Sequence, residues 1–312
     1  MLDTNDVLNP ELLQDALKGL SAEQKYMSPK WFYDEVGSAL FEDITHLPEY
    51  YPTRTETAIL RSRADSLAAL ATPGSALIEL GSGASVKTRI LLDAMRELDL
   101  YVPLDISAEF LATTAADLRT LYPDLKILPV AADFMTTITL PQALSQTDNL
   151  LFFPGSTIGN LESFEARALL TRLHGLPNLR AFILGADLVK DEKVLVAAYD
   201  DAAGVTAAFN LNLLTRLNRE AGADFDVDSF AHRARWNAHL SRIEMHLVST
   251  RKQVVRLGDK RIEFFAGETV HTESSHKYTE ESLGRLARSA GWKLGAFWTD
   301  PEALFAVTIL TP

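Results

Sequence analysis

Cysteine is absent from the chain of 312 residues. That absence excludes disulfides, thiolate metal ligands and a cysteine nucleophile, and it is compatible with a reducing compartment. The sequence also has no apolar run near the ~18 residues that a membrane-spanning helix requires. Its N-terminus has neither the basic start nor the apolar core of a secretory signal. We therefore expect a cytoplasmic protein that has no membrane partner.

An excess of basic residues is missing as well. The 30 Lys and Arg residues are outnumbered by 42 Asp and Glu residues, which gives a formal net charge of −12. A protein that binds nucleic acid needs a basic surface to neutralise phosphates, so this class of partner is disfavoured. The length suits one large domain or two ordinary ones. We expect a monomer with two lobes that acts on a small molecule.

The rest of the chain is organised around a strand that runs into a small-residue turn and then a helix. Residues 77–80 are followed by Gly81, Ser82 and Gly83, and glycines at this spacing let a ligand lie against the backbone. Val86 stands where a dinucleotide fingerprint has its third glycine, which disfavours a nicotinamide cofactor. Lys87 opposes the dipole of the following helix, and this placement favours an anionic group on the ligand.

Acidic residues follow the next two predicted strands. Asp105 ends the segment 100–105, and Asp133 with Phe134 follows the segment 126–131. Each acid alone is more often a helix cap. Together with the glycine turn, a carboxylate for ribose hydroxyls and an acid beside a ring suit a nucleoside with a charged tail.

A loop of small polar residues follows the predicted strand at 149–153. Residues 154–160 are bracketed by glycines and include Gly155, Thr157 and Asn160. Ligands bind at the carboxyl ends of the strands in such sheets, so we expect this loop to face the Gly81 turn. Asn160 could equally cap a helix that starts near Leu161.

Strand and helix patterns alternate along the middle of the chain, which is typical of a doubly wound parallel sheet. Parallel strands are predicted at residues 77–80, 100–105, 126–131, 149–153 and 179–184. A helix at 280–290 and strands at 293–298 and 304–310 end the chain, and the last two strands form an antiparallel hairpin. This seven-stranded arrangement resembles the Rossmann-like fold of class I S-adenosylmethionine (SAM)-dependent methyltransferases.

The alternation is interrupted by a predicted α+β lobe. Residues 187–226 have helical patterns, and residues 242–257 and 261–271 are predicted to be strands of an antiparallel element. Helices are also predicted at 10–20 and 54–70.

The end of this lobe carries a possible polar site. Strand alternation would place His271, Glu273 and Ser275 on one face and Thr272, Ser274 and His276 on the other. Glu273 and Ser275 could hold a small polar ligand, although such a face is usually only solvated. His271 with Glu273 could be half a metal site, but no third ligand is evident. Met245 is either a packing residue or part of an adaptable pocket.

The N-terminal segment before the first strand is rich in aromatic residues. They could form a lid or wall, or simply pack a small subdomain. They are Trp31, Phe32, Tyr33, Phe41, Tyr50 and Tyr51.

Several long motifs closely resemble the histidine-specific Nα-methyltransferases of ergothioneine biosynthesis. They lie at residues 29–38, 47–56, 79–87, 155–160, 187–191, 198–210 and 267–273. The resemblance implies transfer of three methyl groups from SAM to the α-amino group of L-histidine, which gives hercynine and S-adenosylhomocysteine (SAH). It also implies a SAM-binding domain at residues 59–187 and 277–312 and a substrate-binding domain at residues 1–58 and 188–276.

The resemblance further implies roles for individual residues, with no metal ion. The cofactor would be held by Gly81, Ser82, Gly83, Lys87, Asp105, Asp133 and Phe134. Tyr33, Asn160 and Tyr199 would grip the amino-acid end of histidine and align it for catalysis, and Tyr50, Glu273 and Ser275 would surround the imidazole. Phe41, Gly155, Thr157 and Met245 would complete the wall. Alternatives are another amino acid or small amine as substrate, or a SAM-binding module without activity.

Overall fold

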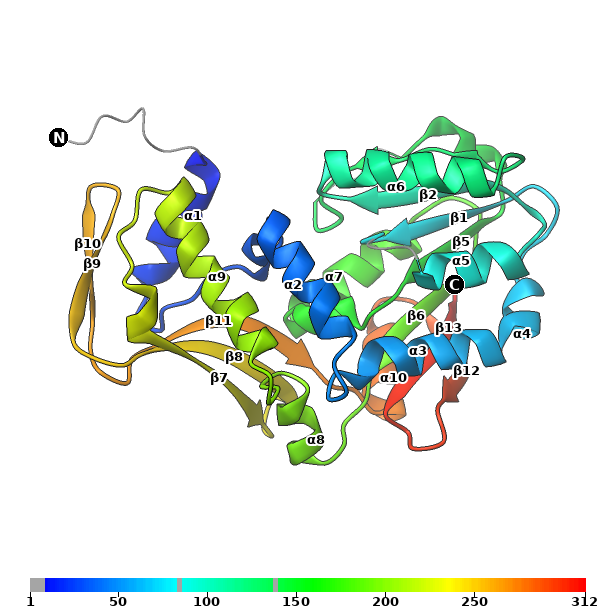
Figure 1. Cartoon of the computed structure of the whole chain (residues 1–312). Helices are drawn as coiled ribbons and strands as arrows, with labels where there is room; N and C mark the ends of the chain where they lie inside the picture. The colour runs from blue at the N-terminus through cyan, green and yellow to red at the C-terminus, as the bar shows by residue number, and fades with distance from the viewer. Residues whose placement is uncertain (1–8, 83–85, 137–139) are drawn as a thin grey trace. The chain divides into compact units, whose positions relative to one another are not determined.

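The computed structural model describes residues 9–82, 86–136 and 140–312. Within them the chain forms two compact units (Figure 1). The sheet unit comprises Pro52–Val189 and Lys277–Pro312, and the second unit comprises the residues up to Tyr51 together with Lys190–His276. None of the helices in these described residues is both long enough and apolar enough to cross a bilayer.

The sheet unit contains one mixed sheet with the strand order β12-β13-β6-β5-β1-β2-β3. Neighbours are parallel from β6 to β3, whereas β13 is antiparallel to both β6 and β12. The class I methyltransferase arrangement with its C-terminal hairpin is therefore confirmed. The strands are β1 (Ser75–Leu80), β2 (Leu98–Asp105), β3 (Lys126–Ile127), β4 (Val130–Ala131), β5 (Asn149–Phe153), β6 (Leu179–Asp187), β12 (Lys293–Thr299) and β13 (Phe305–Thr311).

One predicted strand of this sheet is broken. The segment 126–131 forms two short pieces, β3 and β4, which both pair with β2. Pro129 lies between them, and proline has no N–H to donate to a ladder. The two pieces occupy one strand position, so the sheet has the seven positions expected.

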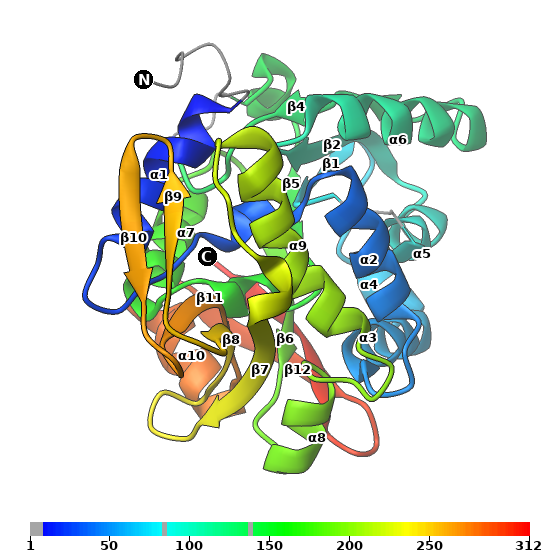
Figure 2. The same cartoon turned by 60° about the vertical axis from the view of Figure 1, so that its left-hand side comes forward.

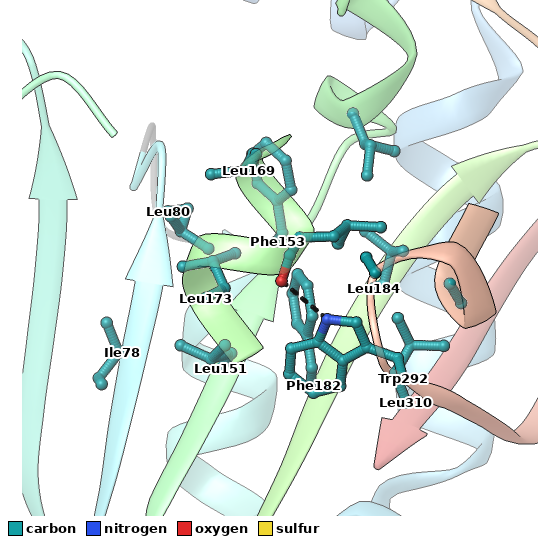
Figure 3. Close-up of a cluster of buried hydrophobic side chains, with 14 of the residues drawn as sticks. Ile78, Leu80, Leu151, Phe153, Leu169, Leu173, Phe182, Leu184, Trp292 and Leu310 are labelled. Carbon is teal, nitrogen blue, oxygen red and sulfur yellow. Dashed lines mark hydrogen bonds between the residues drawn. The ribbon is translucent and has the colours of Figure 1, made fainter. Parts of the chain in front are cut away.

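Helices cover both faces of this sheet. The helices α7 (Ser163–His174) and α10 (Glu280–Ser289) contribute to one apolar core, in which the indole N–H of Trp292 donates to the carbonyl oxygen of Leu170 at 2.9 Å (Figure 3). The core on the other face includes residues of four helices: α3 (Tyr51–Ser62), α4 (Ala64–Ala68), α5 (Val86–Ala94) and α6 (Ala108–Leu121). The single helix predicted at 54–70 is thus two helices, because Arg63 leaves the helical conformation. A short 3-10 helix, η3 (Gln142–Gln146), precedes β5.

The second unit is built on a three-stranded antiparallel sheet with the order β11-β8-β7, and helix α9 packs on it (Figure 2). The predicted antiparallel element is confirmed, but its bounds are wrong. A bend at 250–252 interrupts the first predicted strand, a turn at 265–268 interrupts the second, and β7 was not predicted. The strands are β7 (Phe230–Asn237), β8 (Arg242–Ser249), β9 (Gln253–Leu257), β10 (Lys260–Phe264) and β11 (Thr269–His276). The helices are α1 (Pro10–Leu20), η2 (Pro29–Phe32), α2 (Glu35–Thr45), α8 (Glu192–Ala197), α9 (Val205–Glu220) and η5 (Val227–Ser229).

The two segments that bound the stretch 190–276 are joined inside the sheet unit. The N–H of Val189 donates to the carbonyl of Tyr278 at 2.9 Å, and the N–H of Tyr278 donates to the carbonyl of Asp187 at 2.8 Å. The Lys277 ammonium lies 2.7 Å from the Asp187 carboxylate, and both side chains are buried. A buried charge is tolerated when it is paired in this way. The inserted stretch therefore leaves the sheet and returns to it at neighbouring backbone positions.

Candidate active site

The glycine turn after β1 is shaped for close approach of a ligand. Gly81 has φ = +68°, which favours glycine, and its N–H donates to the carbonyl of Leu104 at 2.8 Å. A Cβ added to Gly81 would lie 3.8 Å from Cε1 of Phe134, so the Phe134 ring stands over the turn. The ring also packs edge-on against Phe153, with centroids 5.3 Å apart. Ser82 is buried beside Gly81. Gly83, the other predicted residue of the turn, lies outside the described residues.

The two predicted acids lie at the carboxyl ends of their strands. Asp105 is the last residue of β2, and its carboxylate accepts the N–H of Ser107 at 3.0 Å. Burial raises the pKa of Asp105. Asp133 is exposed and accepts the N–H of Met135 at 2.7 Å. Both acids thus cap local turns, as isolated acids after strands often do, and both lie at the edge of the sheet where ligands bind.

Lys87 makes an ion pair that the sequence did not reveal. Its ammonium lies 2.5 Å from Oε2 of Glu56, a fully buried residue of α3. The N–H of Gly155 donates to the same oxygen at 2.9 Å. Lys87 Nζ is also 3.7 Å from the position of a Cβ on Gly155. The loop after β5 therefore lies beside the first turn of the helix that follows Gly81, whereas the prediction placed it facing the Gly81 turn itself.

The loop at 154–160 is held in a conformation that few residues adopt. Gly155 and Ser156 have φ = +76° and +59°. The Ser156 hydroxyl accepts the N–H of Asp187 at 2.9 Å, and the Thr157 hydroxyl donates to the carbonyl of Pro154 at 2.9 Å. The loop ends in the short 3-10 helix η4 (Thr157–Asn160).

Asn160 is the last residue of η4 and does not cap the next α-helix. That helix, α7, begins at Ser163, with Glu162 at the N-cap position. The backbone N–H of Glu162 donates to the Glu165 carboxylate at 2.9 Å. The capping interpretation of Asn160 was therefore wrong.

Glu79 is a buried acid just before the glycine turn. Its Oε2 accepts hydrogen bonds from the hydroxyls of Tyr101 at 2.6 Å and Thr88 at 2.7 Å. Burial raises the pKa of Glu79 to about 7, against the lowering effect of these two donors.

A chain of edge-on aromatic rings runs through the second unit. Tyr33 contacts Phe41 at a centroid distance of 5.6 Å, Phe41 contacts Tyr50 at 6.3 Å, and Tyr50 contacts Tyr199 at 6.3 Å. Phe209, from α9, joins Tyr33 and Phe41 at 5.8 and 6.1 Å. Phe209 was not predicted as a site residue, although it lies within the motif at 198–210.

The aromatic residues of the N-terminal segment differ in how deeply they are buried. Trp31, Phe32 and Tyr51 are buried, at 7%, 0% and 2% exposure, as the subdomain-packing interpretation expects. Tyr33 is 43% exposed. The aromatic segment thus contains three core rings, the half-buried rings of Phe41 and Tyr50, and the exposed ring of Tyr33.

The hydroxyls of Tyr199 and Ser275 lie 2.8 Å apart, and both residues are buried. Ser275 stands on the same face of the sheet as Glu273 and Met245, because Glu273 pairs with Met245 and Ser275 pairs with Ile243. Glu273 and Met245 are 8% and 2% exposed. The structure therefore brings a carboxylate, two hydroxyls and a thioether to one face of β8 and β11.

His271 lies on the opposite face, contrary to the alternation predicted. The pairing shifts between His271 and Glu273, so Thr272 is an extra residue of β11. The His271 ring consequently stacks on His246 at 5.0 Å, and its Nε2 lies 3.2 Å from the Ser274 hydroxyl. Thr272 fills the irregularity by donating its hydroxyl to the carbonyl of Met245 at 3.1 Å.

His232 contacts the backbone of Tyr199, and no motif in the sequence indicated this histidine. Its Nδ1 lies 2.8 Å from the side-chain nitrogen of Asn210, and its Nε2 lies 2.8 Å from the carbonyl oxygen of Tyr199. The Asn210 amide donates, which assigns the ring proton to Nε2 and makes Tyr199 the acceptor. Burial lowers the pKa of His232, so the ring is neutral at pH 7.

A family model and two curated proteins that match this sequence all describe histidine methyltransferases. The model of the family described as "Histidine-specific methyltransferase, SAM-dependent" matches residues 12–312. The histidine N-alpha-methyltransferase of Mycolicibacterium smegmatis is 45% identical over 96% of this chain and 94% of its own length. That of Mycobacterium tuberculosis is also 45% identical, with the same coverage of both chains.

A more distant relative extends the comparison to fungi. Ergothioneine biosynthesis protein 1 of Neurospora crassa is 30% identical over 86% of this chain, which matches only 31% of that longer protein. The family model and the two bacterial relatives each span nearly the whole sequence. The chain therefore belongs to the family of SAM-dependent, histidine-specific methyltransferases.

Proposed function

We propose that this protein transfers three methyl groups from SAM to the α-amino nitrogen of L-histidine and so forms hercynine, the first step of ergothioneine biosynthesis. The observation that carries the proposal is the buried Tyr199–Ser275 hydroxyl pair beside Glu273, in a chain that is 45% identical to two histidine N-alpha-methyltransferases. We further propose that the protein acts in the cytoplasm as a monomer.

The sheet unit is assigned to the cofactor. Its polar and aromatic groups suit SAM: the carboxylate at the end of β2 accepts from the ribose hydroxyls, the ring over the glycine turn packs on the adenine, and the Lys87 ammonium donates to the methionine carboxylate. The assigned residues are Gly81, Ser82, Gly83, Lys87, Asp105, Asp133 and Phe134. When bound, SAM supplies an electrophilic methyl group on its sulfonium.

The residues assigned to histidine are grouped by the part of the substrate that each would contact. Tyr33, Asn160 and Tyr199 hold its amino-acid end, Tyr50, Glu273 and Ser275 surround its imidazole, and Phe41, Gly155, Thr157 and Met245 form the wall. The second unit, with Glu273, Ser275 and Met245, is accordingly the substrate-binding domain.

The Tyr199–Ser275 pair explains how the site selects an imidazole. A neutral imidazole has one N–H donor and one acceptor nitrogen. Glu273 accepts the N–H, and Ser275 donates its proton to the other nitrogen while it accepts one from Tyr199. A substrate without both ring nitrogens leaves one of these buried groups unpaired, and this discriminates strongly against it.

The chain's contribution to methyl transfer is alignment and proton removal. The reaction is an in-line displacement by a neutral amine, so the residues that hold the amino-acid end must fix its nitrogen and exclude water. The aromatic rings suit a nitrogen that gains positive charge as methylation proceeds.

Tyr33 is the candidate for alignment or proton loss. We expect Tyr33→Phe to slow at least one of the three methylations, which quench-flow kinetics with mass spectrometry would resolve. Unchanged rates for all three steps would remove Tyr33 from the mechanism.

Titration calorimetry with the common amino acids, in the presence of SAH, tests the substrate. Each amino acid that binds is then incubated with SAM, and its products are weighed by mass spectrometry. We expect histidine alone to bind and to gain three methyl groups, and Glu273→Ala to weaken histidine selectively. Binding of a different amino acid in place of histidine would refute the imidazole assignment.

A further inference from the structure

Glu56 is the most deeply buried acid near the glycine turn that the assigned site does not use. It lies on α3 and has no solvent exposure. An ionised carboxylate in such a position must be paired and hydrogen-bonded. Its partners are the Lys87 ammonium at 2.5 Å and the N–H of Gly155, which lies 2.9 Å from Oε2 and 3.2 Å from Oε1.

The space for this carboxylate depends on a glycine behind it. A Cβ on Gly185, in β6, would lie 2.1 Å from Oε1 of Glu56 and 3.0 Å from its Cδ. At a separation under 3.0 Å, either the added Cβ or the Glu56 carboxylate would have to move. The absence of a side chain at position 185 thus allows the Glu56 carboxylate to reach both Lys87 and Gly155.

The two partners belong to different parts of the assigned site. Lys87 is assigned to the methionine carboxylate of SAM, and the loop that starts at Gly155 carries Thr157 and Asn160, which are assigned to histidine. One carboxylate therefore connects the cofactor contact to the substrate loop by bonds that lie within the sheet unit.

We propose that Glu56 is a positioning residue that holds Lys87 for the carboxylate of the cofactor and the Gly155 loop for histidine. An ammonium has three donors, so Lys87 can donate to Glu56 and keep others for the cofactor. The anchored side chain has less rotamer freedom to lose when the cofactor binds. This inference rests on the proposed function, since it takes the cofactor and substrate assignments from it.

The test is a double-mutant cycle on SAH affinity, measured by calorimetry with the full-length protein. Glu56→Gln is nearly isosteric and removes the charge, so Lys87 loses its ion pair and both partners are left with a neutral amide oxygen, which is a weaker acceptor than a carboxylate. We expect Glu56→Gln to weaken SAH about tenfold or more, and to weaken it less than about threefold when Lys87 is already Met. An equal loss in both backgrounds would mean a general structural effect and would overturn the proposal.

A second readout is the KM for histidine. We expect Glu56→Gln to raise it, because the neutral amide holds the N–H of Gly155 less strongly than the carboxylate does. Glu56→Gln with unchanged or tighter SAH binding would show that Glu56 competes with the cofactor for Lys87, and this too would overturn the proposal.

Gly185→Ala places a methyl group against the Glu56 carboxylate and so displaces it without changing its charge. We expect it to reproduce both effects of Glu56→Gln, and it serves as the test if that variant fails to fold. Gly175→Ala is the matched control, because its Cβ would meet nothing closer than the Arg172 carbonyl at 3.4 Å. Equal behaviour of the two alanine variants would count against the proposal.

SAH binding and histidine methylation, measured on the wild-type protein, distinguish failure of this inference from failure of the proposed function. SAH binding without methylation of histidine would refute the proposed reaction, while the SAH cycle would still decide the role of Glu56. Absence of SAH binding would overturn both.

Discussion

Ser274 and Ser275 are adjacent and lie on opposite faces of β11, so Ser274 provides an internal control for Ser275. Ser275→Ala removes the hydroxyl that pairs with Tyr199 and that we propose contacts the imidazole. We expect the KM for histidine to rise about tenfold, which corresponds to ~1.4 kcal/mol, while SAH affinity is unchanged. Ser274→Ala, on the His271 face, should have little effect on either. A similar loss in both variants would contradict the assignment.

The raised pKa of Glu79 predicts that the free energy of unfolding depends on pH. Its folded-state pKa of about 7 is above the ordinary value of 4.5, so its stabilising contribution is full below pH 4.5 and is lost as the pH rises through 7. Relative to Glu79→Gln, the wild type should lose about 3 kcal/mol of unfolding free energy between pH 4.5 and pH 8. Denaturant titrations of both proteins at several pH values measure this difference. A pH-independent difference would show that Glu79 stays ionised.

Residues that lie in recognisable loops could be predicted from the sequence, and residues that act from within a helix could not. Gly81 and Phe134 follow strands, where ligands bind, and the structure brings them together. Glu56 lies in an amphipathic helix, where a charged residue ordinarily marks the solvent face. Its burial depends on Gly185, which is distant in sequence and has no side chain to suggest a partner.

At the scale of elements, the extra residue in β11 leads to a prediction about deletions. Thr272 is unpaired in the ladder, while the residues before and after it pair with neighbouring residues of β8. Deleting Thr272 should therefore regularise the strand and keep Glu273 and Ser275 on their face. Deleting Ser274 should move Ser275 to the other face.

The measurement is kcat/KM for histidine in the two deletion variants, with SAH binding as the control for folding. We expect the Ser274 deletion to abolish activity and the Thr272 deletion to retain part of it. The reverse order would show that the irregularity itself, and not the face, sets the geometry.

Elements were predictable where periodicity alone determines them. The buried apolar strands and the terminal hairpin follow from such patterns. The irregularity at Thr272 does not, because an alternating sequence has no mark that distinguishes a paired residue from an unpaired one. The break at Pro129 had a visible cause, since proline cannot donate to the ladder.

At the scale of the molecule, ligand binding should stabilise the sheet unit. A ligand that binds only the folded state at a hundred times its Kd adds about 2.7 kcal/mol. We expect SAH at this concentration to raise the midpoint of thermal unfolding in calorimetry, and Lys87→Met to require more SAH for the same shift. No shift with the wild type would contradict the assignment of the cofactor to this unit.

The backbone bonds between Val189 and Tyr278 have a consequence for how such a protein can diversify. An insertion whose two ends meet imposes little on its host, because its length can change without pulling the flanking strands apart. Descendants of one ancestor can therefore exchange or remodel the stretch 190–276 while they inherit the sheet unchanged. Under the proposed assignment of the second unit to the substrate, we expect that grafting this stretch, with its N-terminal companion segment, from a relative of different specificity would change the preferred substrate while the sheet unit keeps its SAH affinity.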